Sequence, residues 1–260
     1  MRTDWAEDDD ERPDTADAAR AREADAVCDA DPVRSAATER EGSGQGDDAS
    51  ADRVARRLEY RADVDAVDRT GVIDQRYAHV REIEEKTVTP AMRRIEAEDP
   101  DRHLTGLDHR LKGKDRLTEK VANFMLSNAE LSPDQAFAKV KDAIRYTFTY
   151  SEDHYAEGVR ADVGRMEERF DLVDLRNSWP GEEYKGINSR WRVPEDNQLF
   201  EVQFHTQASF EAKQLTHVAY EKIRDPATSK GERQKLQDFQ RQVSVDIPVP
   251  THVNDIQDYP

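Results

Sequence analysis

Six polar side chains fall on one face of a predicted β-sheet. Period-two alternation in residues 186–193 and 198–205 separates an apolar side from a polar side. The polar side chains are Glu201, Gln203, His205, Asn188 and Arg190, together with Arg145 of a third predicted strand. Antiparallel sheets often expose such a face to water, so the face alone does not define a site. A phosphate-transferring site needs carboxylates that hold magnesium and several cations that hold a triphosphate, and both are present in separate segments.

The cations come from a basic segment that precedes these strands. Residues 102–120 carry six basic side chains in a chain whose net charge is −17. Four of them, Arg110, Lys112, Arg116 and Lys120, could converge on one polyanion. On a helix, Arg116 and Lys120 lie one turn apart on the same side, and Arg110 and Lys112 lie on the approach to it. A solvated basic face is the competing interpretation, and spacing alone does not decide between the two.

The elements that must position these residues follow from periodicity and capping signals. Helices are predicted from about residue 73, from Thr89 with Pro90, around 117–124, from Ser132, over 151–170, over 207–224 and over 229–245. Strands are predicted over 142–150, which alternates as a half-buried strand does, near 172–175, and as a hairpin of 186–193 with 198–205. This order predicts an α+β fold, with a small mixed or antiparallel sheet of about four to five strands and helices packed on one face.

Charge and composition divide the chain. Residues 1–55 hold 17 acidic and 7 basic residues, which is a net charge of −10, and almost no aliphatic or aromatic groups. We therefore expect a disordered acidic tail over 1–56, a folded domain over 57–225, and a helix with a Pro-rich end over 226–260. The single cysteine, Cys28, excludes an intramolecular disulfide. The start of the chain lacks a basic and apolar leader, and no run of about 18 apolar residues occurs, so we expect a soluble, cytoplasmic protein without a membrane partner.

Several motifs together resemble the synthetases of the RelA/SpoT family. The spacing of Arg110, Lys112 and Lys120 is that of the family's ATP-phosphate cluster, with Arg116 where the family often has Ser. The segment Phe200-Glu201-Val202-Gln203-Phe204-His205-Thr206 is similar to the family's Glu-Ile-Gln-Ile-Arg-Thr strand, and His217 is similar to a His that commonly follows it. The order of the motifs also matches, over roughly residues 57–225. A P-loop and the common dinucleotide, zinc-protease and serine-hydrolase motifs are absent from the sequence.

The resemblance implies a fold, an activity and a set of roles. The fold would be nucleotidyltransferase-like, and the enzyme would move pyrophosphate from ATP to the 3′-hydroxyl of a nucleotide, with Mg²⁺ as cofactor. Magnesium would be held by Asp142 and Glu201, and catalysis would use Glu201, Gln203 and Arg145. The ATP-binding residues would be Arg110, Lys112, Lys114, Arg116 and Lys120. The acceptor-binding residues would be Tyr184, Lys185, Asn188, Arg190 and His205.

Two departures from the family pattern leave the acceptor open. Asp142 precedes Arg145 by three residues where the family has five, and we expect it at the start of the strand, on the side of Arg145. In the acceptor loop, Ile187 stands where the family has a stacking Tyr, and Trp191 stands where it has His. The divergent branch with this character includes ATP nucleotide 3′-pyrophosphokinases and synthetase-like toxins.

Two alternatives to nucleotide pyrophosphorylation follow from these departures. In the first, the acceptor is the 3′ end of tRNA and the protein acts as a toxin, in another cell or its own. Either the acidic tail or a separate protein would then neutralise it. In the second, the chain is a catalytically inactive module that senses nucleotides or binds protein. A basic track through Arg160, Arg165 and Arg190 would favour the tRNA acceptor. The oligomeric state does not follow from the sequence.

Overall fold

The computed structural model describes residues 62, 64–67, 69–225 and 228–260, all within one compact unit, Gly42–Pro260. The predicted acidic tail and Cys28 lie outside the described residues. The strands are β1 (Arg102–Leu104), β2 (Arg145–Tyr150), β3 (Asp171–Asn177), β4 (Ile187–Arg192) and β5 (Leu199–Thr206). The helices are α3 (Val72–Ile83), α4 (Thr89–Ala97), α5 (Lys114–Ser127), α6 (Pro133–Phe137), α7 (Tyr155–Glu167), α8 (Gln207–Arg224) and α9 (Lys230–Ser244), with the short turns η1 (Glu84–Val88), η2 (Leu107–His109) and η3 (Val253–Asp255).

The five strands form one mixed sheet in the order β1-β2-β5-β4-β3. β2 runs parallel to β5, and the other neighbouring pairs are antiparallel. The predicted hairpin of β4 and β5 is confirmed, and its turn contains Asn197 in the left-handed conformation, with φ 64°. The predicted α+β fold class is therefore confirmed.

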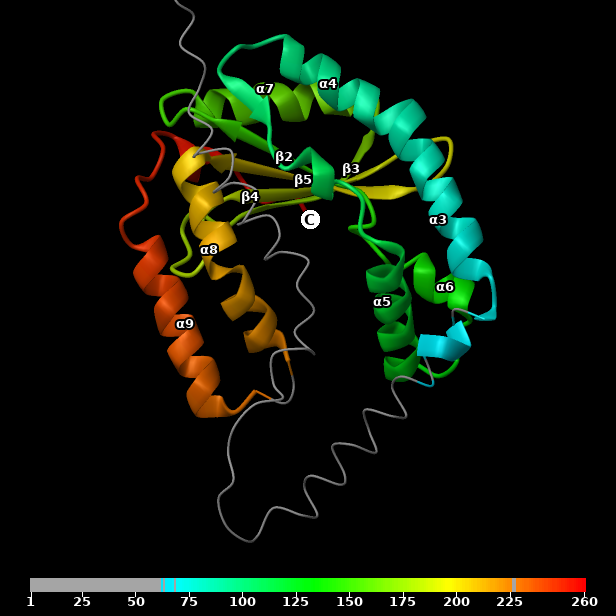
Figure 1. Cartoon of the computed structure of the whole chain (residues 1–260). Helices are drawn as coiled ribbons and strands as arrows, with labels where there is room; N and C mark the ends of the chain where they lie inside the picture. Colours follow the sequence, from blue (N-terminus) through cyan, green and yellow to red (C-terminus); the bar gives the residue numbers. More distant parts are fainter. Residues whose placement is uncertain (1–61, 63, 68, 226–227) are drawn as a thin grey trace, which may run out of the picture. The chain divides into compact units, whose positions relative to one another are not determined.

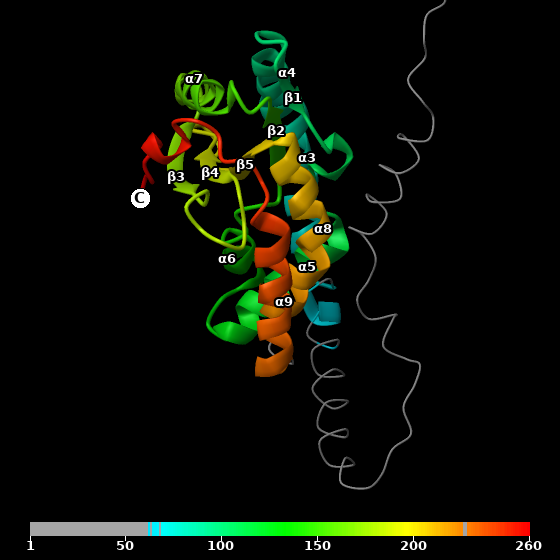
Figure 2. The ribbon, with the colours of Figure 1, turned by 90° about the vertical axis from the view of Figure 1, so that its left-hand side faces the viewer.

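Helices cover the apolar face of the sheet and flank the polar face. Figure 1 shows α4 and α7 on one side of the sheet and α5 and α8 extending from the other, and Figure 2 agrees. On the apolar side, the Tyr155 hydroxyl of α7 donates to the Phe204 carbonyl at 2.7 Å and accepts from the Trp179 indole at 2.9 Å. The polar face therefore lies between two helices that carry charged side chains.

The predicted half-buried strand is buried on both sides. β2 begins at Arg145 rather than near residue 142, and Thr147 and Thr149, on its expected exposed face, are buried. Because β2 lies between β1 and β5 and is packed on both faces, alternation of polar and apolar residues does not mean exposure here. Thr149 instead satisfies its hydroxyl against Thr105 at 2.9 Å.

The predicted capping role of Thr89 is wrong, although α4 begins at Thr89 with Pro90 in its first turn. α3, η1 and α4 form one helical run, and η1 is a π-helical segment. The Thr89 hydroxyl instead bonds to Glu84 and Tyr146. The predicted caps at Ser132 and Thr206 are confirmed, since each forms a capping box, whereas α7 begins at Tyr155 without a capping side chain rather than at the expected Ser151.

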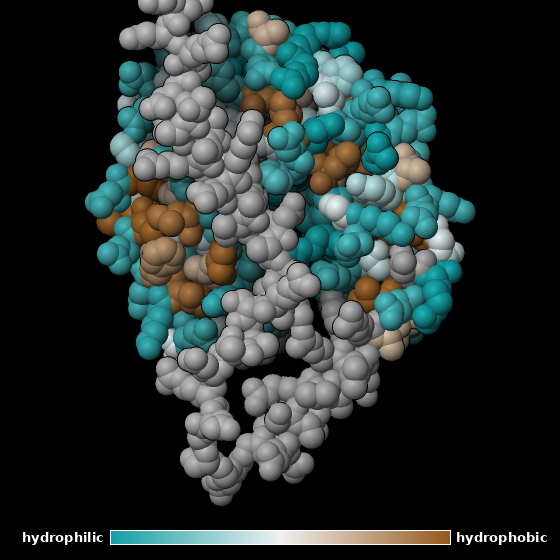
Figure 3. Space-filling view, in the orientation of Figure 1, coloured by the Kyte–Doolittle hydropathy of each residue, from teal (hydrophilic) through white to brown (hydrophobic). Residues whose placement is uncertain are grey.

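The C-terminal part packs against the rest of this unit. α9 lies beside α8, and Tyr259 exchanges two backbone hydrogen bonds with Leu175 of β3, at 3.0 and 3.1 Å. α8 also exposes apolar side chains, with Leu215 at 64% and Val218 at 47% exposure. Figure 3 shows hydrophobic residues gathered where α8 and α9 lie. Within the described part of the chain, no helix combines the length and apolar character needed to span a bilayer.

The packing of α7 against β2 depends on a glycine. A Cβ at Gly158 would lie 2.8 Å from two ring carbons of Tyr150, whereas a Cβ at Gly164 of the same helix would meet nothing within 4 Å. We predict that Gly158→Ala lowers the free energy of unfolding by about 1–3 kcal/mol through overpacking. Gly164→Ala should leave it unchanged or raise it by up to about 1 kcal/mol. Urea denaturation followed by circular dichroism measures both, and equal effects of the two substitutions would contradict this packing.

Candidate active site

Glu201 lies between two arginines in the sheet. The parallel register pairs Glu201 of β5 with Arg145 of β2, and the antiparallel register pairs it with Arg190 of β4. Arg190 also pairs with Asp174 of β3, with Nε 2.9 Å from Oδ1. Cross-strand neighbours share a face of the sheet, so these four side chains form a charged row across four strands.

Gln203 connects Glu201 to helix α8. Its Nε2 donates to Glu201 Oε1 at 2.9 Å, and its Oε1 accepts from Lys213 Nζ at 2.5 Å. Lys213 was not predicted from the sequence. The sequence feature that could have indicated it is the capping box at Thr206, which starts α8 directly after β5. The second turn of α8, which carries Lys213, then lies over the polar face.

Asp142 is tied to two of the predicted phosphate-binding lysines. Its carboxylate lies 2.5 Å from Lys120 Nζ and 3.4 Å from Lys112 Nζ. Burial alone would raise the pKa of Asp142, but Lys112, Lys120 and Arg145 outweigh burial, so the pKa is lowered. Asp142 precedes β2 rather than starting it, which corrects the expected strand position. Its approach to Arg145 is therefore due to the bend before the strand.

The other cations of the basic segment lie apart from Asp142. Arg110 donates to Glu84 Oε1 at 2.7 Å, and Glu84 is 3% exposed. Arg116 lies near Glu119, with 3.6 Å between the charged atoms. Lys114 Nζ lies 2.9 Å from Asp74 Oδ1 of α3.

Arg145 forms the β2 end of the charged row. Among the described residues, its guanidinium has no hydrogen bond or ion pair, although Glu201 is its register partner. Arg145 also acts on His217 of α8, whose pKa is lowered by burial and then by Arg145, Lys213 and Arg116. His217 therefore faces charges from β2, α8 and α5 together. A cation without a partner beside two carboxylates is suited to an incoming anion.

Three of the five side chains predicted to bind the acceptor lie together. The Tyr184 hydroxyl bonds to Asn188 Oδ1 and His205 Nε2, both at 2.9 Å, and His205 Nδ1 contacts Ser209 Oγ at 2.9 Å. Gly186 allows this approach, because a Cβ there would lie 2.7 Å from His205. Lys185 is not in the group, since its ammonium donates to the carbonyls of Trp179 and Gly181 and closes the loop. Arg190 lies further along β4, with Asp174.

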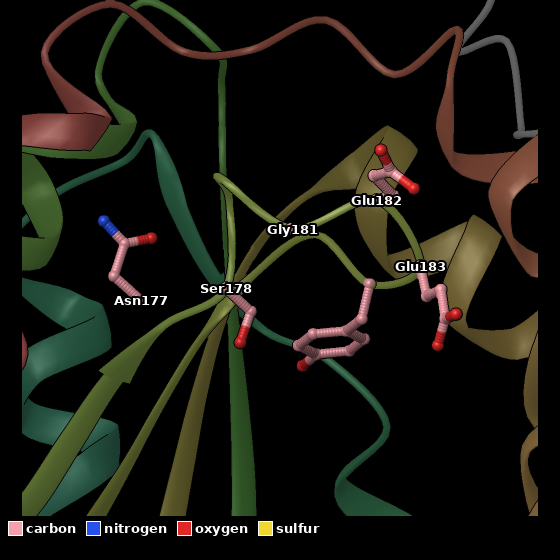
Figure 4. A pocket seen from close by; sticks show the side chains of 6 residues that line it. Asn177, Ser178, Gly181, Glu182 and Glu183 are labelled. Carbon is pink, nitrogen blue, oxygen red and sulfur yellow. The ribbon is translucent and has the colours of Figure 1, made fainter.

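A hollow of about 450 Å³ lies in the loop before β4. Its lining is Asn177, Ser178, Gly181, Glu182, Glu183 and Tyr184. Figure 4 shows the side chains of Asn177 and Glu183 at opposite ends of this loop. Only Tyr184 is shared with the polar cluster of His205 and Asn188, so the hollow borders the charged row without containing it.

The carboxylates of the polar face fit a magnesium ion that arrives with a nucleotide. The described residues contain no group of three His, Cys, Asp or Glu side chains that could hold a metal. Magnesium usually takes only one or two protein carboxylates and completes its coordination with water and substrate phosphates. Asp142 and Glu201, both beside Arg145, are such a pair.

The buried His205 should make the fold sensitive to acid. Burial, then Lys213, lowers the pKa of His205 well below 6.5, so the unfolded chain binds a proton that the native chain does not. The contribution of neutral His205 to the free energy of unfolding is nearly constant well above pH 6.5. It falls as the pH drops, by about 1.4 kcal/mol between pH 7.5 and 5.5. We predict that His205→Gln reduces this loss by that amount, as measured by urea denaturation at both pH values. The matched substitution of the exposed His103, His103→Gln, should not change the loss. Identical pH dependence in wild type and His205→Gln would contradict a neutral buried imidazole.

Solved structures similar to this chain include synthetases from bacteria. Small alarmone synthetase 1 from Bacillus subtilis is 17% identical, with 70% of this chain and 92% of that chain covered and a TM-score of 0.46. Small alarmone synthetase 2 from the same organism is 14% identical, with 66% and 88% covered and a TM-score of 0.43. A GTP pyrophosphokinase family protein from Streptococcus pneumoniae is 15% identical, with 73% and 91% covered and a TM-score of 0.38. No protein-family model and no curated protein matches the chain.

Proposed function

We propose that the protein transfers pyrophosphate from ATP to the 3′-hydroxyl of a nucleotide acceptor in a magnesium-dependent reaction. The observation that carries this proposal is the position of Glu201 between Arg145 and Arg190. Arg145 also acts on Asp142, whose carboxylate pairs with Lys112 and Lys120. Carboxylates next to several cations from different elements are what a polyphosphate-transferring site requires. The motif resemblance to RelA/SpoT synthetases supports the same activity.

The donor phosphates would bind on the side of Lys112, Lys120 and Arg145. Lys112 and Lys120 neutralise Asp142 in the free protein, and both ammonium groups are within reach of a new anion placed against Asp142. Arg110 and Arg116 would contribute from the edges of this region. Lys114 is left out of the proposed ATP site, because it pairs with Asp74.

In the reaction, the acceptor 3′-oxygen attacks the β-phosphorus of ATP. The bond between the β-phosphorus and the oxygen bridging to the α-phosphorus breaks, and AMP leaves with that oxygen and its electron pair. Magnesium, held by Asp142 and Glu201 when bound, would supply charge neutralisation on the phosphate oxygens. Arg145 orients the donor, and the hydroxyl proton passes to Glu201 or, where Glu201 is engaged, to a water or a substrate oxygen.

The acceptor would bind toward Tyr184, Asn188 and His205, which are joined by hydrogen bonds. We favour a small nucleotide over tRNA, because the three arginines that could form a basic track for tRNA are engaged elsewhere. Arg165 pairs with Glu98, Arg160 donates to the His252 carbonyl, and Arg190 pairs with Asp174. Arg160 and Arg165 also lie on α7, which covers the opposite face of the sheet from Arg190. The charged row argues for an enzyme rather than an inactive module.

We predict that Glu201→Gln reduces pyrophosphate transfer by at least about 100-fold, because the variant lacks the charge and the proton acceptor at the reacting centre. Transfer of label from γ-labelled ATP to GDP, GTP, AMP, ATP or tRNA measures the activity. Glu195→Gln, in the exposed turn of the same hairpin, should retain wild-type turnover. Wild-type turnover in a folded Glu201→Gln variant would refute the proposed site.

Three lysines of the basic segment should differ in their effect on ATP. We predict that Lys112→Ala and Lys120→Ala each raise KM for ATP about tenfold or more, because each variant loses one charge-assisted hydrogen bond to the ATP phosphates. Lys114→Ala should leave KM for ATP near the wild-type value, because its ammonium pairs with Asp74. Steady-state kinetics at saturating acceptor measures all three. Unchanged KM for ATP in Lys112→Ala and Lys120→Ala would mean that this basic surface is an ordinary solvated one.

A further inference from the structure

We propose that Lys213 is a positioning residue that fixes the side-chain amide of Gln203 so that its NH₂ group faces Glu201. This inference rests on the proposed function, in which Glu201 works at the reacting centre. The contact chain runs from Lys213 Nζ to Gln203 Oε1 at 2.5 Å, and from Gln203 Nε2 to Glu201 Oε1 at 2.9 Å.

The direction of this chain follows from what each group is able to donate or accept. An ammonium group only donates, so the group of Gln203 that faces Lys213 must be the carbonyl oxygen. The NH₂ group then faces Glu201, and it bonds well to an ionised carboxylate, which only accepts. Lys213 therefore selects the amide orientation that suits the ionised form of Glu201.

Lys213 and Gln203 are both held in place. Gln203 is 6% exposed, so water has little access to replace the lysine. The Lys213 ammonium lies 5.3 Å from the centroid of the Phe210 ring, one helical turn earlier. The capping box of Thr206 and Ser209 fixes the start of α8 directly after β5. It therefore also limits how far Lys213 can shift relative to β5.

Removal of the ammonium group frees the amide to turn. A Gln203 carbonyl directed at Glu201 would set two acceptors against each other, and the hydrogen bond to the Glu201 carboxylate would be lost. The other groups near Glu201 stay unchanged: Arg145 on β2, Arg190 on β4 with its partner Asp174 on β3, and Tyr184 in the loop before β4. Loss of Lys213 should therefore lower kcat and leave KM for ATP nearly unchanged.

The first test is kinetic and compares three variants of the full chain. Lys213→Met keeps the length of the side chain without the donor, Lys213→Arg keeps a donor, and Lys222→Met removes an exposed lysine of the same helix. Pyrophosphate transfer is measured at pH 7 with ATP, magnesium and whichever of GDP, GTP, AMP or ATP the wild type uses. We expect Lys213→Met to lower kcat about tenfold with KM for ATP within about twofold. Lys213→Arg should recover most of kcat, and Lys222→Met should match wild type.

The second test reads the amide directly and does not depend on turnover. The side-chain NH₂ resonances of Gln203, assigned by their loss in Gln203→Glu, should move in Lys213→Met at pH 7 and stay at their wild-type positions in Lys222→Met. Gln203 resonances at the same positions in wild type and Lys213→Met, or a Lys213→Met variant with wild-type kcat, would overturn the positioning role. A wild-type chain that transfers nothing to any acceptor would refute the proposed function instead, and the amide resonances would still decide the role of Lys213.

Discussion

The parallel pairing of β2 with β5 is the constraint on which the candidate site depends. Every other neighbouring pair of strands in this sheet is antiparallel, and β5 enters between β2 and β4. This insertion gives Glu201 an arginine on each side, one from a distant strand and one from its own hairpin. A shift of one residue in the register would turn Glu201 toward the apolar face and bring Phe200 or Val202 to the polar face. The core and the chemistry are thus fixed by the same backbone hydrogen bonds.

Charge neutralisation in the free protein explains how so many ionic groups share one face. Asp142 is neutralised by Lys112 and Lys120, Arg190 by Asp174, and Arg110 by Glu84. Each pair reduces the cost of holding a charge away from water, although partly buried ion pairs add little net stability. Arg145 differs from these cations, because within the described ranges its side chain forms no ion pair, although Glu201 is its register partner. A bound polyphosphate would replace the present carboxylate partners of some of these cations, so the charged groups of the site are already in place before it binds.

Local patterns predicted much of the fold, and contacts between distant segments account for the rest. Period-two alternation was enough to place Glu201 and Gln203 opposite Phe200 and Val202, because the face of a strand is a local property. The same alternation was misleading for β2, since it does not say how many neighbours a strand has. The turn of Lys114 toward Asp74, the bonding of Thr89 to Tyr146 and the reach of Lys213 to Gln203 each join separate elements. Such contacts depend on how the helices pack on the sheet and on one another, which local sequence patterns do not predict.

The segment at residues 253–259 has a consequence for how copies of this protein behave toward one another. A sheet edge presents unpaired N–H and C=O groups that another chain can use as a template for strand pairing. One edge of this sheet is β1, which is only three residues long, and the other, β3, is covered where Leu175 pairs with Tyr259 and Asn177 bonds to Asp258. Neither edge offers a long open ladder. The closing segment therefore bears on resistance to aggregation, a property separate from any chemistry on the polar face.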